Sequence, residues 1–231
     1  MAVETYKSNK LTDKRHILQS LAFPVSFVVL LWLVKSAELL FGISLHQFGI
    51  WPQSLSGLKG VIFAPFIHGS ISHLASNSLP LLVLGFVLFY FYREIAIRVL
   101  IWGVIITGLW VWVFARSSYH IGASGVIYQL LGFLFVSGVL RKHPRLMAIS
   151  LLVAFLYGSL IWGIFPIRVQ MSWESHMMGL LAGALLAYFF RGHGPQRPVY
   201  SWELEEDGES DVQEDSLEEG EDSVAERDEP T

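Results

Sequence analysis

The chain has 231 residues, of which 53% are hydrophobic and 16% are charged, and its mean hydropathy of +0.49 predicts a membrane protein rather than a soluble globular one. Its net charge of −4 is the sum of two oppositely charged regions. Residues 1–200 contain 15 Lys and Arg and 5 Asp and Glu, whereas residues 201–231 contain 1 Arg and 15 Asp and Glu. The chain contains no cysteine, which excludes disulfides, thiolate catalysis and cysteine-ligated metal sites.

Six apolar segments are long enough to cross a bilayer, and we expect helices at 19–42, 74–92, 97–115, 124–140, 146–165 and 174–190. Helices are favoured because backbone polar groups in lipid must be hydrogen-bonded within their own segment. The predicted fold class is an all-α membrane protein built as a six-helix bundle. Its predicted parts are a cytoplasmic N-terminal segment at 1–18, a six-helix domain at 19–192, and a disordered acidic cytoplasmic tail at 193–231.

The first helix follows a basic segment, but it is too long for a cleaved signal peptide and is expected to be retained. It contains Lys35 and Glu38, three residues apart. We interpret them as a pair that extends its charged ends towards the outer interface, and not as part of a proton pathway.

Polar residues gather where the second helix begins. The segment contains His68, His73 and Asn77, and the last two lie four residues apart on one helix face. Both side chains can donate hydrogen bonds, which is what an oxyanion hole requires.

The fourth helix opens with Gly122-Ala123-Ser124-Gly125, which places a hydroxyl at the edge of an apolar segment. Polar groups are costly in a bilayer, so each is a candidate functional residue. From Ser124 to about Leu140 the helix spans about 25 Å, short of a hydrocarbon core of about 30 Å. We therefore expect a water-filled dip above Ser124. Tyr128 lies one turn further on the same face.

The sixth helix carries the second candidate, His176, near its start. Serine and histidine together are the two parts of a nucleophile and general-base pair. Gly179 and Gly183 follow on one face as a GxxxG element, which lets helix backbones approach closely in lipid. Gly132 on the fourth helix is expected to help this close approach. It should bring Ser124 within hydrogen-bond reach of the His176 imidazole and place Tyr128 against the same ring.

Positive charges predict the orientation of the helices. On one side lie Lys7, Lys10, Lys14, Arg15, Arg93, Arg98, Arg141, Lys142, Arg145, Arg191 and Arg197, and on the other Lys59, Arg116 and Arg168. Both termini are therefore predicted to be cytoplasmic. The second, fourth and sixth helices then begin at the outer face of the membrane, so their polar residues are expected to lie at the same depth in the bilayer.

Taken together, these motifs resemble those of the rhomboid intramembrane serine proteases, in the order and spacing of the basic bacterial six-helix form. The resemblance rests on His68, His73 and Asn77 at the second helix, Gly122 to Gly125 at the fourth, and His176, Gly179 and Gly183 in the sixth. It covers roughly residues 19–190.

The resemblance implies a Ser–His dyad without a carboxylate, with Ser124 as nucleophile and His176 as general base. It also implies an oxyanion hole made by His73, Asn77 and the backbone amide of Ser124. Gly122 would shape the loop before the serine, Tyr128 would pack on His176, and His68 would be a supporting residue, with Gly179 and Gly183 in helix packing.

The expected partners are transmembrane protein substrates, cleaved near their outer end, and the lipid bilayer. Neither nucleic acid nor a metal or other cofactor is expected, and the expected location is a bacterial inner membrane. Two alternatives belong to other classes. One is a catalytically silent relative that binds membrane proteins and directs their trafficking; such proteins usually lose the serine or the histidine. The other is a transporter, which would predict midplane charges and internal repeats that this chain lacks.

Overall fold

A computed structural model describes residues 2–141, 147–148, 151–152, 155, 162–166 and 171–194. Over these residues the fold is all-α, apart from one isolated β-bridge. The long helices are α1 (Ala2–Phe41), α3 (Ile71–Phe91), α4 (Ala96–Phe114), α5 (Ser124–Leu140) and α8 (Trp173–Phe189). Between α1 and α3 lie the short elements η1 (His46–Phe48), η2 (Leu55–Gly57), α2 (Gly60–Phe63) and η3 (Ala64–Phe66).

Five of the six predicted helices correspond to α1, α3, α4, α5 and α8, which confirms the helical bundle expected from the apolar segments. Within the described residues, Lys14–Phe41, Ile71–Phe91 and Ala96–Phe114 are long and apolar enough to cross a membrane, and α5 is shorter, with 17 residues. The fifth predicted helix, at 146–165, lies largely outside the described residues, as does the predicted tail. The described positions 147–148, 151–152, 155 and 162 are helical.

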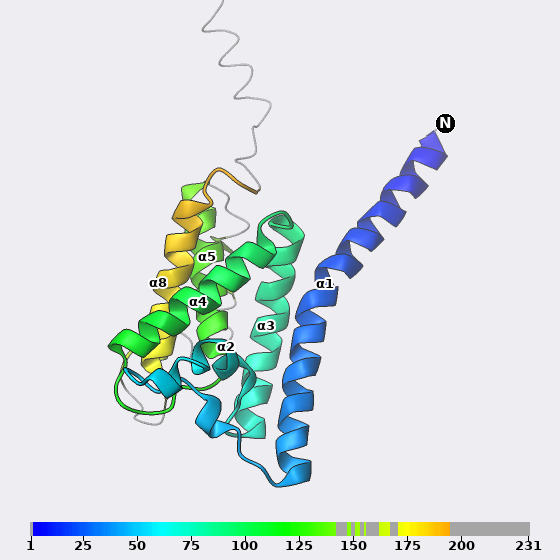
Figure 1. Ribbon diagram of the computed structural model, residues 1–231. Helices are drawn as coiled ribbons and strands as arrows, with labels where there is room; N and C mark the ends of the chain where they lie inside the picture. Colours follow the sequence, from blue (N-terminus) through cyan, green and yellow to red (C-terminus); the bar gives the residue numbers. More distant parts are fainter. Residues whose placement is uncertain are drawn as a thin grey trace, which may run out of the picture. The chain divides into compact units, whose positions relative to one another are not determined.

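Helix α1 differs from its prediction because it begins at Ala2, well before residue 19. Hydropathy marks where a helix enters lipid, whereas the polar residues that precede this point can continue the same helix. Pro24 lies inside α1, and Figure 1 shows the helix changing direction part-way along. A proline inside a helix removes one backbone hydrogen bond and favours such a bend.

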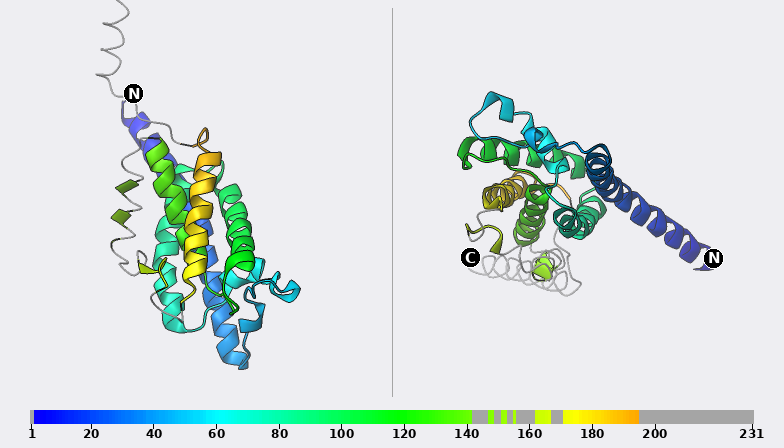
Figure 2. Two further views of the ribbon diagram at one scale, coloured as in Figure 1. Left: turned by 90° about the vertical axis from the view of Figure 1, so that its left-hand side faces the viewer. Right: turned by 90° about the horizontal axis from the view of Figure 1, so that it is seen from below.

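Helix α5 is the centre of the bundle. It packs against α8, α3 and α4, and the end-on view in Figure 2 shows it between α3 and α8. Its buried face includes Ile127, Leu130, Phe133 and Leu134, each almost completely removed from solvent. On its α4 side the buried side-chain nitrogen of Gln129 donates to the carbonyl of Val99 at 2.8 Å, which joins the two helices by a polar contact.

One end of the bundle carries the starts of α3, α5 and α8 together with the segment that contains α2 and η3 (Figure 1). Two backbone hydrogen bonds, of 3.0 and 2.9 Å, pair Ile50 with His120 and join this segment to the loop before α5. Backbone groups of two loops thus satisfy each other beside the helix starts.

At the other end, Arg141 holds α5 and α8 together. Its guanidinium is buried and donates to the carbonyls of Phe190, at 2.6 Å, and His193, at 2.5 Å, and to the Ser137 hydroxyl. The Tyr92 hydroxyl donates to the same serine at 2.9 Å. These bonds satisfy carbonyls that the ends of helices leave without partners.

Lys35 and Glu38 form an ion pair of 3.1 Å, but the interpretation that they extend towards the interface is wrong. Both side chains are largely buried, and both also bind backbone groups. Lys35 Nζ donates to the carbonyl of His68 at 2.8 Å, and the amide of Leu45 donates to Glu38 Oε1 at 2.8 Å. The pair therefore fastens α1 to the segments that follow it, which hydropathy alone does not reveal.

Candidate active site

Helices α5 and α8 approach each other at backbone distance. A methyl group at Gly179 would overlap the carbonyl oxygen of Gly125, and one at Gly183 would overlap that of Gln129. On the opposite side of the contact, a methyl group at Gly132 would overlap the carbonyl of Leu180. Only glycine permits this separation, which sets how far apart side chains on the two helices can be.

This close approach brings Ser124 and His176 together. Their Oγ and Nε2 atoms are 2.8 Å apart, within hydrogen-bond distance, and both side chains are buried. The ring of Tyr128 is stacked on the imidazole, with centroids 4.3 Å apart and planes inclined by 12°. The serine and histidine thus have the separation that proton transfer between them requires.

The second imidazole nitrogen has a partner that the sequence did not suggest. His176 Nδ1 lies 2.8 Å from the carbonyl oxygen of Gly163. Because a carbonyl oxygen only accepts, Nδ1 carries a proton and donates it. In the neutral ring Nε2 is then an acceptor for the hydroxyl of Ser124. A backbone carbonyl here occupies the place that a carboxylate takes in a catalytic triad.

The loop before Ser124 is fixed by its backbone. Gly122 has φ of +110°, which side-chain-bearing residues rarely adopt, and its amide donates to the carbonyl of Ala64 at 2.9 Å. The next amide, of Ala123, donates to Nε2 of His68 at 3.3 Å. Helix α5 begins at Ser124, so the amide of Ser124 has no acceptor within its own helix and lies at the positive end of the helix dipole.

His68 lies outside the spanning helices but is buried, with 1% of its surface exposed. Burial is the main reason why its pKa is lowered to about 4, since the charged ring would lose its hydration, and the positive charge on a protonated His73 lowers it further. At neutral pH the ring is therefore uncharged, as its acceptor role towards Ala123 requires.

His73 and Asn77 face the same loop from α3. Ser70 caps this helix, and its Oγ accepts from the amide of His73 at 3.0 Å. A methyl group at Gly122 would lie 3.0 Å from His73 Nε2 and 3.9 Å from Asn77 Nδ2. The Asn77 nitrogen is buried and has no hydrogen-bond acceptor among the described residues. The amide thus keeps a donor available beside the loop that leads to Ser124.

His120, for which the sequence suggested no role, links the loop before α5 to the start of α8. It is buried, its Nε2 lies 3.0 Å from the carbonyl of Arg116, and its Nδ1 lies 2.5 Å from the hydroxyl of Ser172. Ser172 Oγ is in turn 2.6 Å from Ser175 Oγ. Nearby, Arg116 Nε and Glu174 Oε1 form an ion pair of 3.2 Å. These contacts hold the two loops together and do not include His176.

The arrangement therefore joins residues from three helices around one loop. Ser124 comes from α5, His176 from α8, and His73 and Asn77 from α3. The carbonyls of Gly163 and Ala64 complete the set, and sequence reasoning missed both because any residue type supplies a carbonyl. Such a set can transfer a proton from a hydroxyl to an imidazole and present hydrogen-bond donors nearby.

Comparisons with known proteins identify the family of the chain. A family model described as "Rhomboid domain" matches residues 56–193. An uncharacterized protein from Mycobacterium tuberculosis is 38% identical over 175 residues, which cover 71% of this chain and 72% of the relative. One from Mycobacterium bovis matches to the same extent, and one from Mycobacterium leprae is 34% identical and is covered over 68% of its length. The chain thus belongs to the rhomboid family.

Proposed function

We propose that this protein is an intramembrane serine endopeptidase that cleaves transmembrane helices near the outer membrane face. Ser124 is the nucleophile, and His176 is the general base and later the general acid. The observation that carries the proposal is the 2.8 Å contact between Ser124 Oγ and His176 Nε2, with the other ring nitrogen held by Gly163. The hydroxyl is thereby held beside the ring nitrogen that carries no proton, as a nucleophile and general-base pair requires.

In the first step, Ser124 Oγ attacks the scissile carbonyl carbon while its proton passes to His176 Nε2. The imidazolium that forms donates from both nitrogens, and the carbonyl of Gly163 stabilises its charge through Nδ1–H. Tyr128 limits rotation of the ring by stacking on it. The negative oxygen of the tetrahedral intermediate is stabilised by donors from Asn77, His73 and the amide of Ser124.

In the second step, the intermediate collapses and the peptide C–N bond breaks. His176 gives its Nε2 proton to the leaving amine and becomes neutral again. Water then attacks the acyl-enzyme ester with His176 as base, which releases the new carboxyl end and restores Ser124. Whenever the ring is neutral, its proton must lie on Nδ1 so that Nε2 can act as the base. The hydrogen bond to the carbonyl of Gly163 favours this tautomer.

We further propose a multi-pass protein of the bacterial inner membrane, with both termini in the cytoplasm and residues 193–231 as an appended tail. The helices that carry the site begin at one end of the bundle, and the positive-inside rule makes this the outer end. Substrates are then transmembrane proteins that enter from the bilayer, and no metal or other cofactor takes part. A silent relative that only binds membrane proteins is disfavoured because the serine, the histidine and their contact are all present.

A cleavage assay tests the proposal. Purified protein in liposomes is mixed with a model transmembrane substrate, in parallel with Ser124→Ala and His176→Ala. We expect cleavage by the unaltered protein and none above background by either variant. Cleavage that persists in the Ser124→Ala variant would show that another group is the nucleophile. If the unaltered protein is folded but cleaves nothing, the result would favour a catalytically silent relative.

A further inference from the structure

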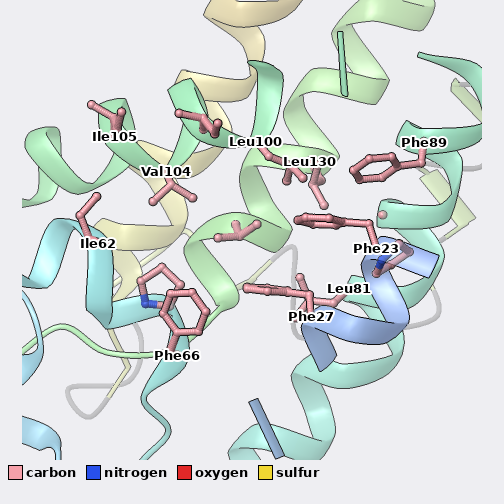
Figure 3. A pocket seen from close by; sticks show the side chains of 15 residues that line it. Phe23, Phe27, Ile62, Phe66, Leu81, Phe89, Leu100, Val104, Ile105 and Leu130 are labelled. Carbon is pink, nitrogen blue, oxygen red and sulfur yellow. The ribbon is translucent and has the colours of Figure 1, made fainter. Parts of the chain in front are cut away.

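An apolar cavity lies on the flank of the bundle between α1 and α4. It has a volume of about 270 Å³, and only apolar side chains and one glycine line it. Figure 3 shows Phe23 and Phe27 reaching into it from α1, with Leu100 and Val104 of α4 on the opposite side. We propose that this cavity binds one acyl chain of a membrane phospholipid.

The cavity opens towards the surface of the bundle that faces lipid, which favours a lipid as its ligand. Helices α1, α3 and α4 supply most of the wall, and each is apolar and long enough to span a membrane. Ile62 and Ile101 line the cavity and are also about half exposed on the outer surface of the bundle. The cavity is therefore continuous with the surface that meets hydrocarbon, and its walls lack a group that could hold water.

The aromatic side chains inside the cavity disfavour a helix as the occupant. Phe23 and Phe27 project into it from α1, so a substrate helix or a helix of a second copy, about 10 Å across, would have to displace these rings to enter. An acyl chain is thinner, flexible and already dissolved in the surrounding medium, so it enters at little cost.

The back of the cavity connects to the loop before Ser124. Pro65 and Phe66 line the cavity, and the residue before them, Ala64, accepts the hydrogen bond from Gly122. Phe27 packs edge-on against Phe66, with ring centroids 5.5 Å apart. A bound chain would fill the space beside this contact and support η3, because empty apolar space forfeits packing contacts.

Photo-crosslinking of the full chain tests the proposal. Vesicles of palmitoyl-oleoyl phosphatidylglycerol and phosphatidylethanolamine would contain a small fraction of phosphatidylcholine with a diazirine in one acyl chain. After irradiation, mass spectrometry maps the labelled residues. We expect several-fold more label on Leu100, Val104 and Phe66 than on Leu109 and Val113, which are exposed on α4 but outside the cavity. Equal label on the two sets would overturn the proposal, because it indicates only general contact with the bilayer.

Two matched variants sharpen the test. Ile101→Trp places a large ring at the cavity, whereas Ile97→Trp makes the same change one turn earlier on α4 at a residue that does not line it. We expect the first to remove most of the cavity label and the second to leave it. Cavity label that is unchanged in the folded Ile101→Trp variant would overturn the proposal, and if that variant misfolds, the comparison within the unaltered protein decides.

Thermal unfolding gives a second readout. Adding phospholipid to delipidated protein in detergent should raise the Tm of the unaltered chain and of Ile97→Trp more than that of Ile101→Trp, because a ligand stabilises the state that binds it. An equal rise in all three would contradict a specific site. Neither readout involves proteolysis, so failure here leaves the proposed function untouched.

Discussion

At the scale of single residues, Asn77 is informative because its amide nitrogen is buried without an acceptor in the part of the chain that the structure describes. An unpaired buried donor costs free energy, so its presence in a folded protein calls for a reason. Its position beside Gly122, together with His73, supplies one. The donor would find its acceptor only when negative charge develops on a bound substrate.

Removal of either donor is expected to slow the reaction. Asn77→Ala and His73→Ala should each lower kcat by about 10²–10³-fold, because they remove an interaction made chiefly in the transition state. Cleavage of a model transmembrane substrate in liposomes measures the effect. Ser72→Ala is the control, since this serine is exposed on the same helix. An unchanged kcat in the Asn77→Ala variant would contradict the role given to this residue.

His68 gives a prediction about pH. Its folded-state pKa is about 4, below the usual value of 6.5. As the pH falls below about 6.5, the unfolded chain takes up a proton first, so the stability of the folded state decreases until about pH 4. His68→Gln removes this titration and can keep an acceptor for Ala123. We expect its unfolding midpoint to fall less between pH 6.5 and 4 than that of the unaltered protein.

Unfolding of both proteins at a series of pH values measures this difference. Because His73 lies beside His68, with ring centroids 5.1 Å apart, both curves are measured in a His73→Gln background, so that the difference isolates His68. Two parallel curves would contradict a neutral, buried His68.

Ser124 and His176 could be singled out from the sequence as candidate site residues, because polar side chains in apolar helices are costly and both helices were predicted to begin at the same depth. The carbonyls of Gly163 and Ala64 could not, since each is a backbone group whose role depends on how the chain folds. The burial of Lys35 and Glu38 was missed for the same reason, because their partners are backbone groups distant in sequence or in an unpredicted turn.

At the scale of helices, the contact between α5 and α8 sets the distance between Ser124 and His176. Gly183→Ala should force the helices apart, because the added methyl group would overlap the carbonyl of Gln129. Overpacking of this kind costs about 1–3 kcal/mol, and a displacement of the imidazole should lower kcat as well. Gly192→Ala is a matched control, since open space surrounds that position.

Thermal unfolding and the cleavage assay measure the two effects of Gly183→Ala. A variant as stable and as active as Gly192→Ala would show that the close approach of the helices is not required. Loss of stability with full activity would separate helix packing from positioning of the imidazole.

Helix positions were predictable where apolar length decides them. The prediction for 124–140 agrees with α5, and α3, α4 and α8 differ from their predictions by one to three residues at each end. The start of α1 was not predictable from hydropathy, because a polar extension of a helix carries no apolar signal. Likewise, the short elements between α1 and α3 follow from loop contacts such as the pairing of Ile50 with His120.

At the scale of the whole molecule, the family match ends at residue 193, before the acidic tail. Ending the chain after Tyr200 should leave proteolysis intact if the tail is only an appendage, because every contact described at the site lies before that point. Ending it after Phe189 is the matched comparison. That cut removes the carbonyls of Phe190 and His193, to which Arg141 donates, and should destabilise the bundle.

Cleavage rates and Tm of the two shortened chains measure this prediction. Loss of activity in the chain that ends after Tyr200, with its Tm unchanged, would show that the tail takes part in the reaction. Equal stability of both shortened chains would contradict the role of Arg141.

The most direct test of the whole account is covalent labelling of Ser124. A fluorophosphonate reacts with an activated serine when Oγ attacks phosphorus and fluoride leaves. Mass spectrometry of the labelled full-length protein should find one adduct, on Ser124, which forms much more slowly in the folded His176→Ala variant. An adduct on another serine, or an equal rate of labelling without His176, would contradict the claim that these two residues form the catalytic pair.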